Sequence, residues 1–247
     1  MKMTANTIFI TGGGSGIGRG LAEAFHKLGN QVIISGRRKS ALDEATKANP
    51  GMASIELDLE NLGSIQAAAK QLTAAHPTLN VLINNAGIML ADTAADTQDD
   101  AQLVATVTTN LIGPLRLTSA LIDHLKAQPS ATIVYNTSVL AFVPMAATSV
   151  YSATKAALHS YVLSQRFKLR NSSVRVLELA PPWVRTDLMN SREAEAAMPL
   201  DAFIEESMKQ FGAGSDEILV GNAAQLRSNP GPHEGAFVTE FNASLPF

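Results

Sequence analysis

The sequence predicts an α/β fold in which helices cover both faces of a doubly wound sheet of seven mostly parallel strands. Short apolar segments alternate with segments of helical periodicity along most of the chain, and the connections between them are short. A glycine-rich segment at residues 12–18 separates the first apolar segment from the first helical one. We find no repeat, low-complexity tract or linker, so residues 1–247 are expected to form a single domain.

Composition limits the classes of function. The chain has 247 residues, of which 46% are hydrophobic and 17% are charged, and its net charge is −3. It lacks a basic block, so we expect neither nucleic acid nor an anionic membrane as a partner. No window has the length and apolarity of a membrane span or a signal peptide. The absence of cysteine fits a reducing, cytoplasmic location. Five scattered histidines and no carboxylate cluster predict no metal site.

The first strand and helix are expected to form a phosphate-binding unit. Residues 7–11 are an apolar run, and the glycine-rich segment follows directly. Apolar residues then recur at helical spacing up to Gly29: Leu21, Ala22, Phe25 and Leu28. Backbone amides at the start of that helix can bind a pyrophosphate, helped by the helix dipole. The glycines are spaced as Gly12-x-x-x-Gly16-x-Gly18 and not as G-x-G-x-x-G, and the alternative is a flexible glycine turn.

The end of the second strand, predicted at residues 31–35, bears on the choice of cofactor. Enzymes for the unphosphorylated dinucleotide place Asp or Glu there, about twenty residues after the glycines, to bind the ribose hydroxyls. No acid occurs between Glu23 and Asp43, and Arg37 and Arg38 occur instead. A guanidinium binds a 2′-phosphate through bidentate hydrogen bonds. The sequence therefore favours NADP(H) over NAD(H), and the alternative is that both arginines lie in a solvated loop.

The middle of the chain continues the alternation. Strands are predicted at residues 53–57 and 80–83, and helices at residues 40–48 and 65–72. The fourth strand is followed by Asn84, Asn85, Ala86 and Gly87. Small side chains there let a cofactor ring approach the backbone, whereas Asn84 is expected to have a structural role.

A long helical pattern covers residues 97–127 and is interrupted at Gly113 and Pro114. Proline has no N–H, so Pro114 cannot donate to the carbonyl of Asn110 four residues earlier. We expect a kink at this point, with the Asn110 carbonyl available to a water or another donor.

Three residues near the middle of the chain are the candidate catalytic group. Ser138 ends a strand predicted at residues 131–137, and Tyr151 and Lys155 lie four apart on the following helix, so they share one face. An ammonium beside a phenol favours the phenolate, so we expect Lys155 to lower the pKa of Tyr151. Such a tyrosine can transfer a proton to a substrate oxygen that Ser138 also binds. The alternative is a half-buried tyrosine beside a solvated lysine. His159 is expected to be a packed or interface residue.

The last third of the chain is less regular. A strand is predicted at residues 174–179, and Pro181 and Pro182 follow it. Residues 187–211 have an apolar face and form either a lid over the substrate or a plain surface helix. A helix is expected at residues 215–227 and a final strand at residues 235–240.

Together these motifs resemble the short-chain dehydrogenase/reductase family, over essentially the whole chain. They occur in the family's order: Thr11-Gly12-x-x-x-Gly16-Ile17-Gly18, Asp58, Asn84-Asn85-Ala86-Gly87, Asn110, Ser138 and Tyr151-x-x-x-Lys155. Residues 198–206 and 217–221 are also similar to a subgroup named after a D-alanylation-operon oxidoreductase of Gram-positive bacteria. The resemblance implies a Rossmann-type domain and a homodimer or homotetramer.

The resemblance also implies roles for individual residues. The cofactor-binding residues would be Gly12, Ser15, Gly16, Ile17 and Gly18 at the pyrophosphate, Asp58 and Leu59 at the adenine, Asn85, Ala86 and Gly87 along the ribose, and Pro181, Val184 and Thr186 at the nicotinamide amide. Tyr151 would be the general acid/base, Lys155 would bind the nicotinamide ribose, Ser138 would orient the substrate, and Asn110 would hold a relay water. Two departures are Pro182, where the family usually has glycine, and Ser15, where many NADP enzymes have a basic residue.

The expected function is reversible hydride transfer between NADP(H) and a carbonyl or secondary alcohol. An apolar pocket mouth favours a small neutral substrate, and its expected residues are Met89, Leu90, Leu140, Phe142, Met145, Trp183, Leu188 and Met189. A catalytically silent, nicotinamide-dependent sensor or binding module is the alternative.

Overall fold

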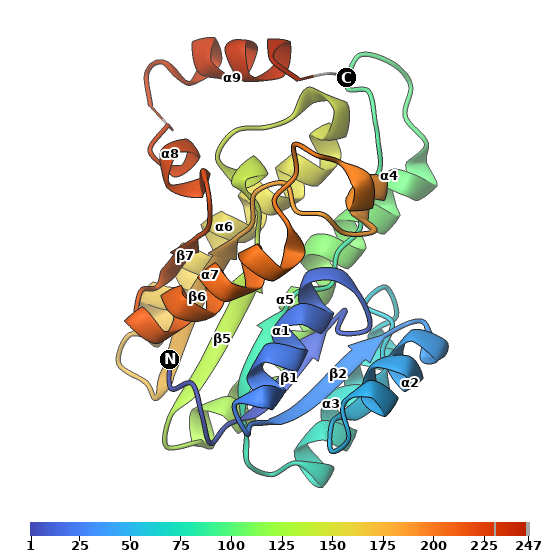
Figure 1. The fold of residues 1–247 in the computed structure, drawn as a ribbon, viewed down its shortest axis with the longest axis vertical. Helices are drawn as coiled ribbons and strands as arrows, with labels where there is room; N and C mark the ends of the chain where they lie inside the picture. The colour runs from blue at the N-terminus through green and yellow to red at the C-terminus, as the bar shows by residue number, and fades with distance from the viewer. Residues whose placement is uncertain (230, 246–247) are drawn as a thin grey trace.

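A computed structural model describes residues 1–229 and 231–245, and its centre is a sheet of seven strands. The strand order is β3-β2-β1-β4-β5-β6-β7, and every neighbouring pair is parallel (Figure 1). The strands are β1 (Thr7–Thr11), β2 (Gln31–Gly36), β3 (Ala53–Glu56), β4 (Leu79–Asn84), β5 (Ala131–Asn136), β6 (Val174–Ala180) and β7 (Glu217–Leu219). The doubly wound α/β fold predicted from the sequence is therefore confirmed.

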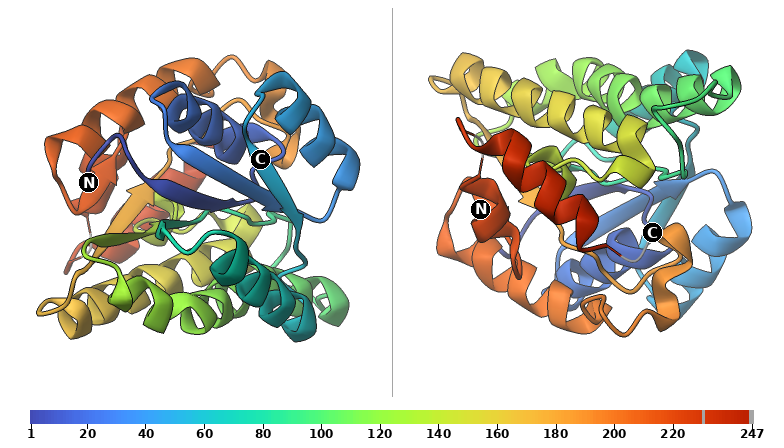
Figure 2. Two further views of the ribbon diagram at one scale, coloured as in Figure 1. Left: turned by 90° about the horizontal axis from the view of Figure 1, so that it is seen from below. Right: turned by 90° about the horizontal axis from the view of Figure 1, so that it is seen from above.

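Helices pack on both faces of the sheet, which gives three layers (Figure 2). One face is covered by α3 (Leu62–Ala75), α5 (Gly113–Ala127) and α6 (Ser149–Leu169), and the other by α1 (Gly16–Lys27), α2 (Lys39–Ala48) and α7 (Leu200–Ala213). The helix α4 (Asp100–Val107) packs on α6 in the first of these layers. The helices α8 (Ala223–Arg227) and α9 (Glu234–Ala243) lie outside both layers. Within the described residues, no helix has the length and apolarity needed to cross a membrane.

The two cores follow from the alternation of side chains along each strand. On β1, Phe9 points into the core beneath α3 and α5, whereas Ile8 and Ile10 point into the core beneath α1 and α7. All five residues of β1 are buried. A strand covered by helices on both sides buries both of its faces, so it reads as a continuous apolar run.

The sheet also fixes where a ligand can bind. From β1 the chain moves outward to β2 and β3, and it then crosses back to β4 on the other side of β1. The connections after β1 and β4 therefore diverge to opposite faces and open a crevice at the carboxyl ends of these strands.

The long helical pattern is interrupted near Gly113 and Pro114, as expected, and the interruption is a π-helix. Between α4 and α5 the chain forms a π-helix, Thr108–Ile112, that contains Asn110. Pro114 occupies the first turn of α5, where a missing N–H is tolerated. The long helical pattern is thus two α-helices joined by a wider turn.

The predictions for the last thirty or so residues are wrong in two places. The helix expected at residues 215–227 is the edge strand β7 followed by the short helix α8. The strand expected at residues 235–240 is the helix α9. Phe237, Val238 and Phe241 are spaced three and four apart, and in α9 they pack against the cluster of Val139 and Leu140. A short apolar run is compatible with a strand and with a helix, so its periodicity alone could not decide between the two structures.

The turn between β1 and α1 requires glycine at defined positions. Gly12 and Gly16 have φ values of +67° and +52°, in the left-handed region. A Cβ atom on Gly18 would lie 2.3 Å from the Gly12 carbonyl oxygen and 2.4 Å from Asn85 Nδ2. The turn is therefore packed directly against the segment that follows β4.

We expect Gly18→Ala to lower the free energy of unfolding by about 1–3 kcal/mol, because the added methyl group must displace backbone. Urea unfolding measures this value. Gly235→Ala is the matched control, because a Cβ atom there meets nothing within 4 Å among the described residues. Its effect should stay within about 0.5 kcal/mol. Equal effects of the two substitutions would contradict the packing of the turn.

Candidate active site

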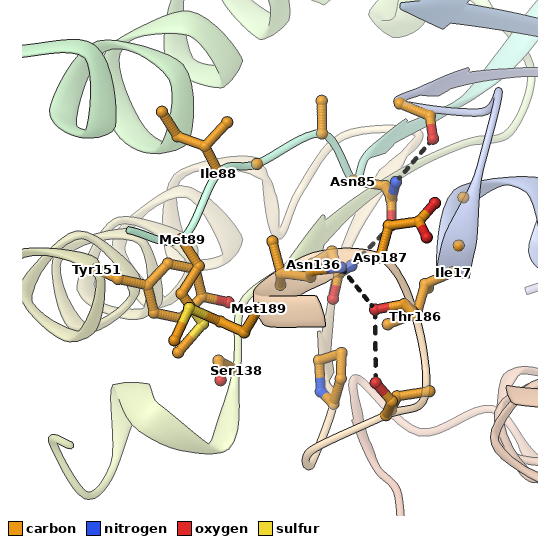
Figure 3. A pocket seen from close by; sticks show the side chains of 18 of the residues that line it. Ile17, Asn85, Ile88, Met89, Asn136, Ser138, Tyr151, Thr186, Asp187 and Met189 are labelled. Atoms are coloured by element: carbon orange, nitrogen blue, oxygen red, sulfur yellow. Dashed lines mark hydrogen bonds between the residues drawn. The ribbon is translucent and has the colours of Figure 1, made fainter. Parts of the chain in front are cut away.

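A cavity of about 910 Å³ lies at the carboxyl ends of the central strands. All of the residues proposed from the sequence to contact a cofactor line it: Gly12, Ser15, Gly16, Ile17, Gly18, Arg37, Arg38, Asp58, Leu59, Asn85, Ala86, Gly87, Tyr151, Lys155, Pro181, Val184 and Thr186. Ser138 lines it as well, whereas Asn110 does not. Figure 3 shows Tyr151 and Ser138 near one end, with Ile17, Asn85 and Thr186 toward the other.

The glycine end of the cavity is built by hydrogen bonds between two strands. The Thr11 hydroxyl accepts from the backbone N–H groups of Asn85 and Ala86, both at 3.0 Å. The Asn85 amide in turn donates to the Thr11 carbonyl at 2.9 Å. These bonds hold the glycine turn after β1 against the segment after β4.

The same end has the features that a pyrophosphate requires. Ser15 is the N-cap of α1, and its side chain accepts no capping hydrogen bond, so the first backbone amides of the helix remain available to an anion. The close packing at Gly12 and Gly18 leaves backbone, and not side chains, at the surface of the turn. The residues present therefore fit a dinucleotide.

Arg37 and Arg38 lie at the rim of this end, after β2. An Arg37 guanidinium nitrogen lies 3.0 Å from a Glu60 carboxylate oxygen, and Arg38 donates to the Ser15 hydroxyl at 3.3 Å. Arg37 is largely exposed, so its ion pair with Glu60 is weak and can be exchanged for another anion.

Tyr151, Ser138 and Lys155 converge at the other end of the cavity. Tyr151 and Lys155 are buried in the first two turns of α6, and Ser138 is buried just after β5. Burial raises the pKa of Tyr151 to about 12, and a hydrogen bond with Ser138 offsets part of this rise. Burial lowers the pKa of Lys155 to about 8. The Lys155 ammonium donates to the Asn136 carbonyl at 2.8 Å and lies 5.4 Å from the centre of the Tyr151 ring.

The expected lowering of the Tyr151 pKa is therefore not seen in this structure. Removal of the phenol from water is the larger effect, and it favours the neutral form. The ammonium of Lys155 donates to the Asn136 carbonyl. Burial therefore holds the Tyr151 phenol in its neutral form.

Asn110 supports the cavity from behind. Its side chain accepts from the Ile88 N–H and donates to the Ile88 carbonyl, both at 2.8 Å. It also donates to the Thr154 hydroxyl at 3.3 Å. Through these bonds the π-helix fixes the segment after β4 against α6, which carries Tyr151 and Lys155.

His159 is packed, as expected, and its partner is a buried acid. His159 Nδ1 lies 2.8 Å from a carboxylate oxygen of Glu178, which is fully buried on β6. Glu178 also accepts from the Thr137 hydroxyl at 2.7 Å. This cluster holds the backbone immediately before Ser138.

The pocket mouth differs from the expectation at two residues. Six of the eight expected side chains line the cavity: Met89, Leu140, Met145, Trp183, Leu188 and Met189. Leu90 instead borders a small separate hollow beside α4. Phe142 is buried behind the wall, where its ring packs edge-on against His159 at 5.2 Å. Residues adjacent to a pocket in sequence can point away from it, and spacing alone does not reveal this.

Several lining residues were missed from the sequence. Asn136 and Thr137 lie at the end of β5, and the apolar end also includes Phe241 from α9. The position of Asn136 and Thr137 directly before Ser138 is a signal that could have identified them. Phe241 had no such signal, because its segment was expected to be a strand. Within residues 1–229 and 231–245, no group of three or more His, Asp or Glu side chains could hold a metal ion.

The lowered pKa of Lys155 gives a pH-dependent stability. Between about pH 8 and its unperturbed value of 10.5, the unfolded chain binds a proton at Lys155 that the folded chain has lost. The free energy of unfolding therefore rises with pH in this window, by up to about 1.4 kcal/mol per pH unit from this group.

Urea unfolding of the wild type and Lys155→Met at pH 7.5, 9 and 10 tests this expectation. The wild type should gain stability relative to the variant as the pH rises above about 8. A constant difference across these pH values would show that Lys155 keeps its ordinary pKa in the folded protein.

Comparison with known proteins agrees with the fold and the motifs. The family model described as short chain dehydrogenase matches residues 6–197. The uncharacterized oxidoreductase DltE of Bacillus subtilis (strain 168) is 41% identical over 219 residues, which make up 88% of this chain and 87% of DltE.

Solved structures show the same fold. A short chain dehydrogenase from Burkholderia cenocepacia J2315 in complex with NADP has a TM-score of 0.85 at 24% identity, with 97% of this chain and 98% of that chain covered. A short chain dehydrogenase/reductase from Burkholderia phymatum in complex with NAD has a TM-score of 0.84 at 20% identity, with 97% and 96% covered. Because the family model matches most of the sequence and DltE is similar over nearly its whole length, this chain belongs to the short-chain dehydrogenase/reductase family of oxidoreductases and is DltE-like within it.

Proposed function

We propose that this protein catalyses reversible hydride transfer between NADP(H) and a carbonyl or secondary alcohol, with Tyr151 as the general acid and base. The observation that carries the proposal is the convergence of Tyr151, Ser138 and Lys155 in the cavity that the glycine turn also borders. A bound nicotinamide cofactor supplies the hydride for reduction and accepts it in oxidation.

The chain's own groups would handle the proton. In reduction the neutral Tyr151 phenol donates its proton to the carbonyl oxygen, and the Ser138 hydroxyl hydrogen-bonds the same oxygen. Lys155 binds the nicotinamide ribose, and its ammonium stabilises the phenolate left on Tyr151. A water held by the Asn110 carbonyl returns the proton from solvent through Lys155. Orientation of the reacting groups contributes about 7–11 kcal/mol in well-arranged systems.

The cofactor would lie along the cavity from the arginines to the tyrosine. The pyrophosphate would be held by Ser15, Ile17 and the glycine turn. The adenine would be held by Asp58 and Leu59. The other contacts we propose are Asn85, Ala86 and Gly87 for the ribose and Pro181, Val184 and Thr186 for the nicotinamide amide. All of these residues border the cavity, which supports the assignment.

The substrate would be a small neutral ketone, aldehyde or alcohol, aromatic or medium aliphatic. Met89 and Met189 lie beside Tyr151 and Ser138 (Figure 3), and Leu140, Met145 and Phe241 add further apolar surface. Thioether side chains adapt to irregular apolar ligands.

Residues 187–198 would act as the lid, a shorter segment than the 187–211 considered from the sequence. This part borders the cavity, and Met189 and Asn190 adopt left-handed backbone conformations, with φ values of +54° and +51°. The remainder is mostly α7, whose Phe203 and Phe211 are buried against the sheet.

We also propose a homo-oligomer in the cytoplasm. Large apolar side chains on α4 and α6 remain exposed, and they would be covered in a dimer or tetramer: Leu103, Val104, Leu163 and Phe167. The absence of cysteine supports a reducing compartment.

The mechanism predicts that Tyr151→Phe lowers kcat by about a hundredfold or more, because the proton donor is lost. NADPH binding should remain measurable. The assay follows oxidation of NADPH with a panel of neutral carbonyls. Tyr161→Phe, on the same helix but outside the cavity, is the matched control and should retain activity. Undiminished activity of Tyr151→Phe would refute the mechanism, and cofactor binding with no turnover of any carbonyl by the wild type would favour a sensor.

The cofactor preference is supported by Arg37 and Arg38 at the rim, and solved relatives hold NADP in one case and NAD in another. Arg37→Asp should weaken NADPH binding by about ten- to a hundredfold, because a charge-assisted hydrogen bond to the 2′-phosphate is replaced by repulsion. NADH binding should change little. Calorimetry measures both, with Arg170→Asp as a control outside the cavity. Equal losses for the two cofactors would remove the claim.

A further inference from the structure

Asn136 lies where the two ends of the cavity meet. It is the last residue of β5, it is 7% exposed, and it lines the cavity. Figure 3 shows it between the Asn85 end and the Tyr151 end. Its backbone carbonyl accepts from the Lys155 ammonium, and its side-chain Nδ2 donates to Asn85 Oδ1 at 2.8 Å.

The orientation of the Asn136 amide follows from its neighbours. The Thr11 carbonyl can only accept, so Asn85 must direct its Nδ2 toward Thr11. The Oδ1 atom of Asn85 therefore faces Asn136. Because this oxygen can only accept, Asn136 must donate to it with Nδ2. The Oδ1 atom of Asn136 is thereby directed away from this chain of hydrogen bonds.

Asn136 Oδ1 is buried and has no hydrogen-bond partner among residues 1–229 and 231–245. Buried acceptors in folded proteins are nearly always paired, because an unpaired one loses its bond to water without replacement. Asn84 Oδ1 is also buried without a partner in the described chain, but Asn84 does not border the cavity. Asn136 does border the cavity, so a ligand bound there can supply the hydrogen-bond donor that its Oδ1 lacks.

We propose that Asn136 is a further cofactor-binding residue, whose Oδ1 accepts a hydrogen bond from an N–H or O–H donor of the nicotinamide riboside half. The inference rests on the proposed function, because it takes the cavity to hold a nicotinamide dinucleotide. The backbone carbonyl of Asn136 accepts from Lys155, and Asn136 precedes Ser138 by two residues. This position at the Tyr151 end of the cavity favours the riboside half of the cofactor over the adenosine half. The donor is a ribose hydroxyl or the carboxamide N–H.

Calorimetry with Asn136→Leu and three ligands tests this proposal. The ligands are NADPH, 2′-phospho-ADP-ribose, which lacks nicotinamide, and adenosine 2′,5′-bisphosphate. NADPH should bind about three- to tenfold more weakly than to the wild type, as expected for loss of one neutral hydrogen bond. Adenosine 2′,5′-bisphosphate should bind unchanged. A loss with 2′-phospho-ADP-ribose identifies the ribose hydroxyl as donor, and no loss identifies the carboxamide.

Asn84→Leu is the matched control, because it removes a similar buried amide at the end of the adjacent strand β4. It should leave the affinities for all three ligands unchanged. Asn136→Ser replaces Asn136→Leu if circular dichroism shows that the leucine variant does not fold, and the same selective loss is expected.

Two outcomes overturn the inference. One is unchanged NADPH affinity, and the other is an equal loss for all three ligands, which would show that Asn136 acts only through Asn85 and the glycine turn. The test requires binding and not turnover. A selective loss in a protein that reduces no carbonyl would support this inference and contradict the hydride-transfer proposal, whereas turnover without a selective loss would contradict this inference alone.

Discussion

The structure depends on one chain of hydrogen bonds that crosses three adjacent strands. It runs from Thr11 at the end of β1 through Asn85 after β4 and Asn136 at the end of β5 to Lys155 on α6. Parallel strands end at the same edge of the sheet, so short polar side chains can span it. This chain fixes the glycine turn, which would bind phosphate, relative to the groups that would move the proton. The side-chain amides of Asn85 and Asn136 suit this position because an amide both donates and accepts hydrogen bonds. The strand ends are therefore connected without a buried ion pair between them.

Much of the fold was predictable, because strands buried on both faces give apolar runs that local sequence displays directly. β1, β2, β4 and β6 were all found in this way. The errors concern residues 215–245, where β7 has only three residues and α9 is recognisable only by what it packs against. Val238 and Phe241 are three apart, so they share a face of a helix but would lie on opposite faces of a strand. Both pack against the cluster that contains Val139 and Leu140, which are about a hundred residues away in sequence. Tertiary contacts of that kind leave no local pattern.

The candidate site could be located from spacing, but its electrostatics could not. Tyr151 and Lys155 share a helix face, as their separation requires. Burial raises the pKa of the tyrosine, and the lysine donates to the Asn136 carbonyl at the end of β5. Neither feature follows from the spacing of the two residues on α6. The same holds for Phe142, which follows Leu140 by two residues yet packs on His159 behind the wall. Sequence therefore identified most of the residues that gather at the site, whereas Asn136, Thr137 and Phe241 and the contacts within the site became evident only from the fold.

The π-helix at Thr108–Ile112 has a consequence for how this protein can change over evolution. A π-turn is equivalent to an α-helix that has received one additional residue. Deleting a residue there would restore a regular helix, but it would also rotate the preceding segment by about 100° relative to α5. Asn110 could then no longer meet both backbone groups of Ile88. Insertions and deletions should therefore be tolerated in the exposed loop before α4 and excluded from this turn.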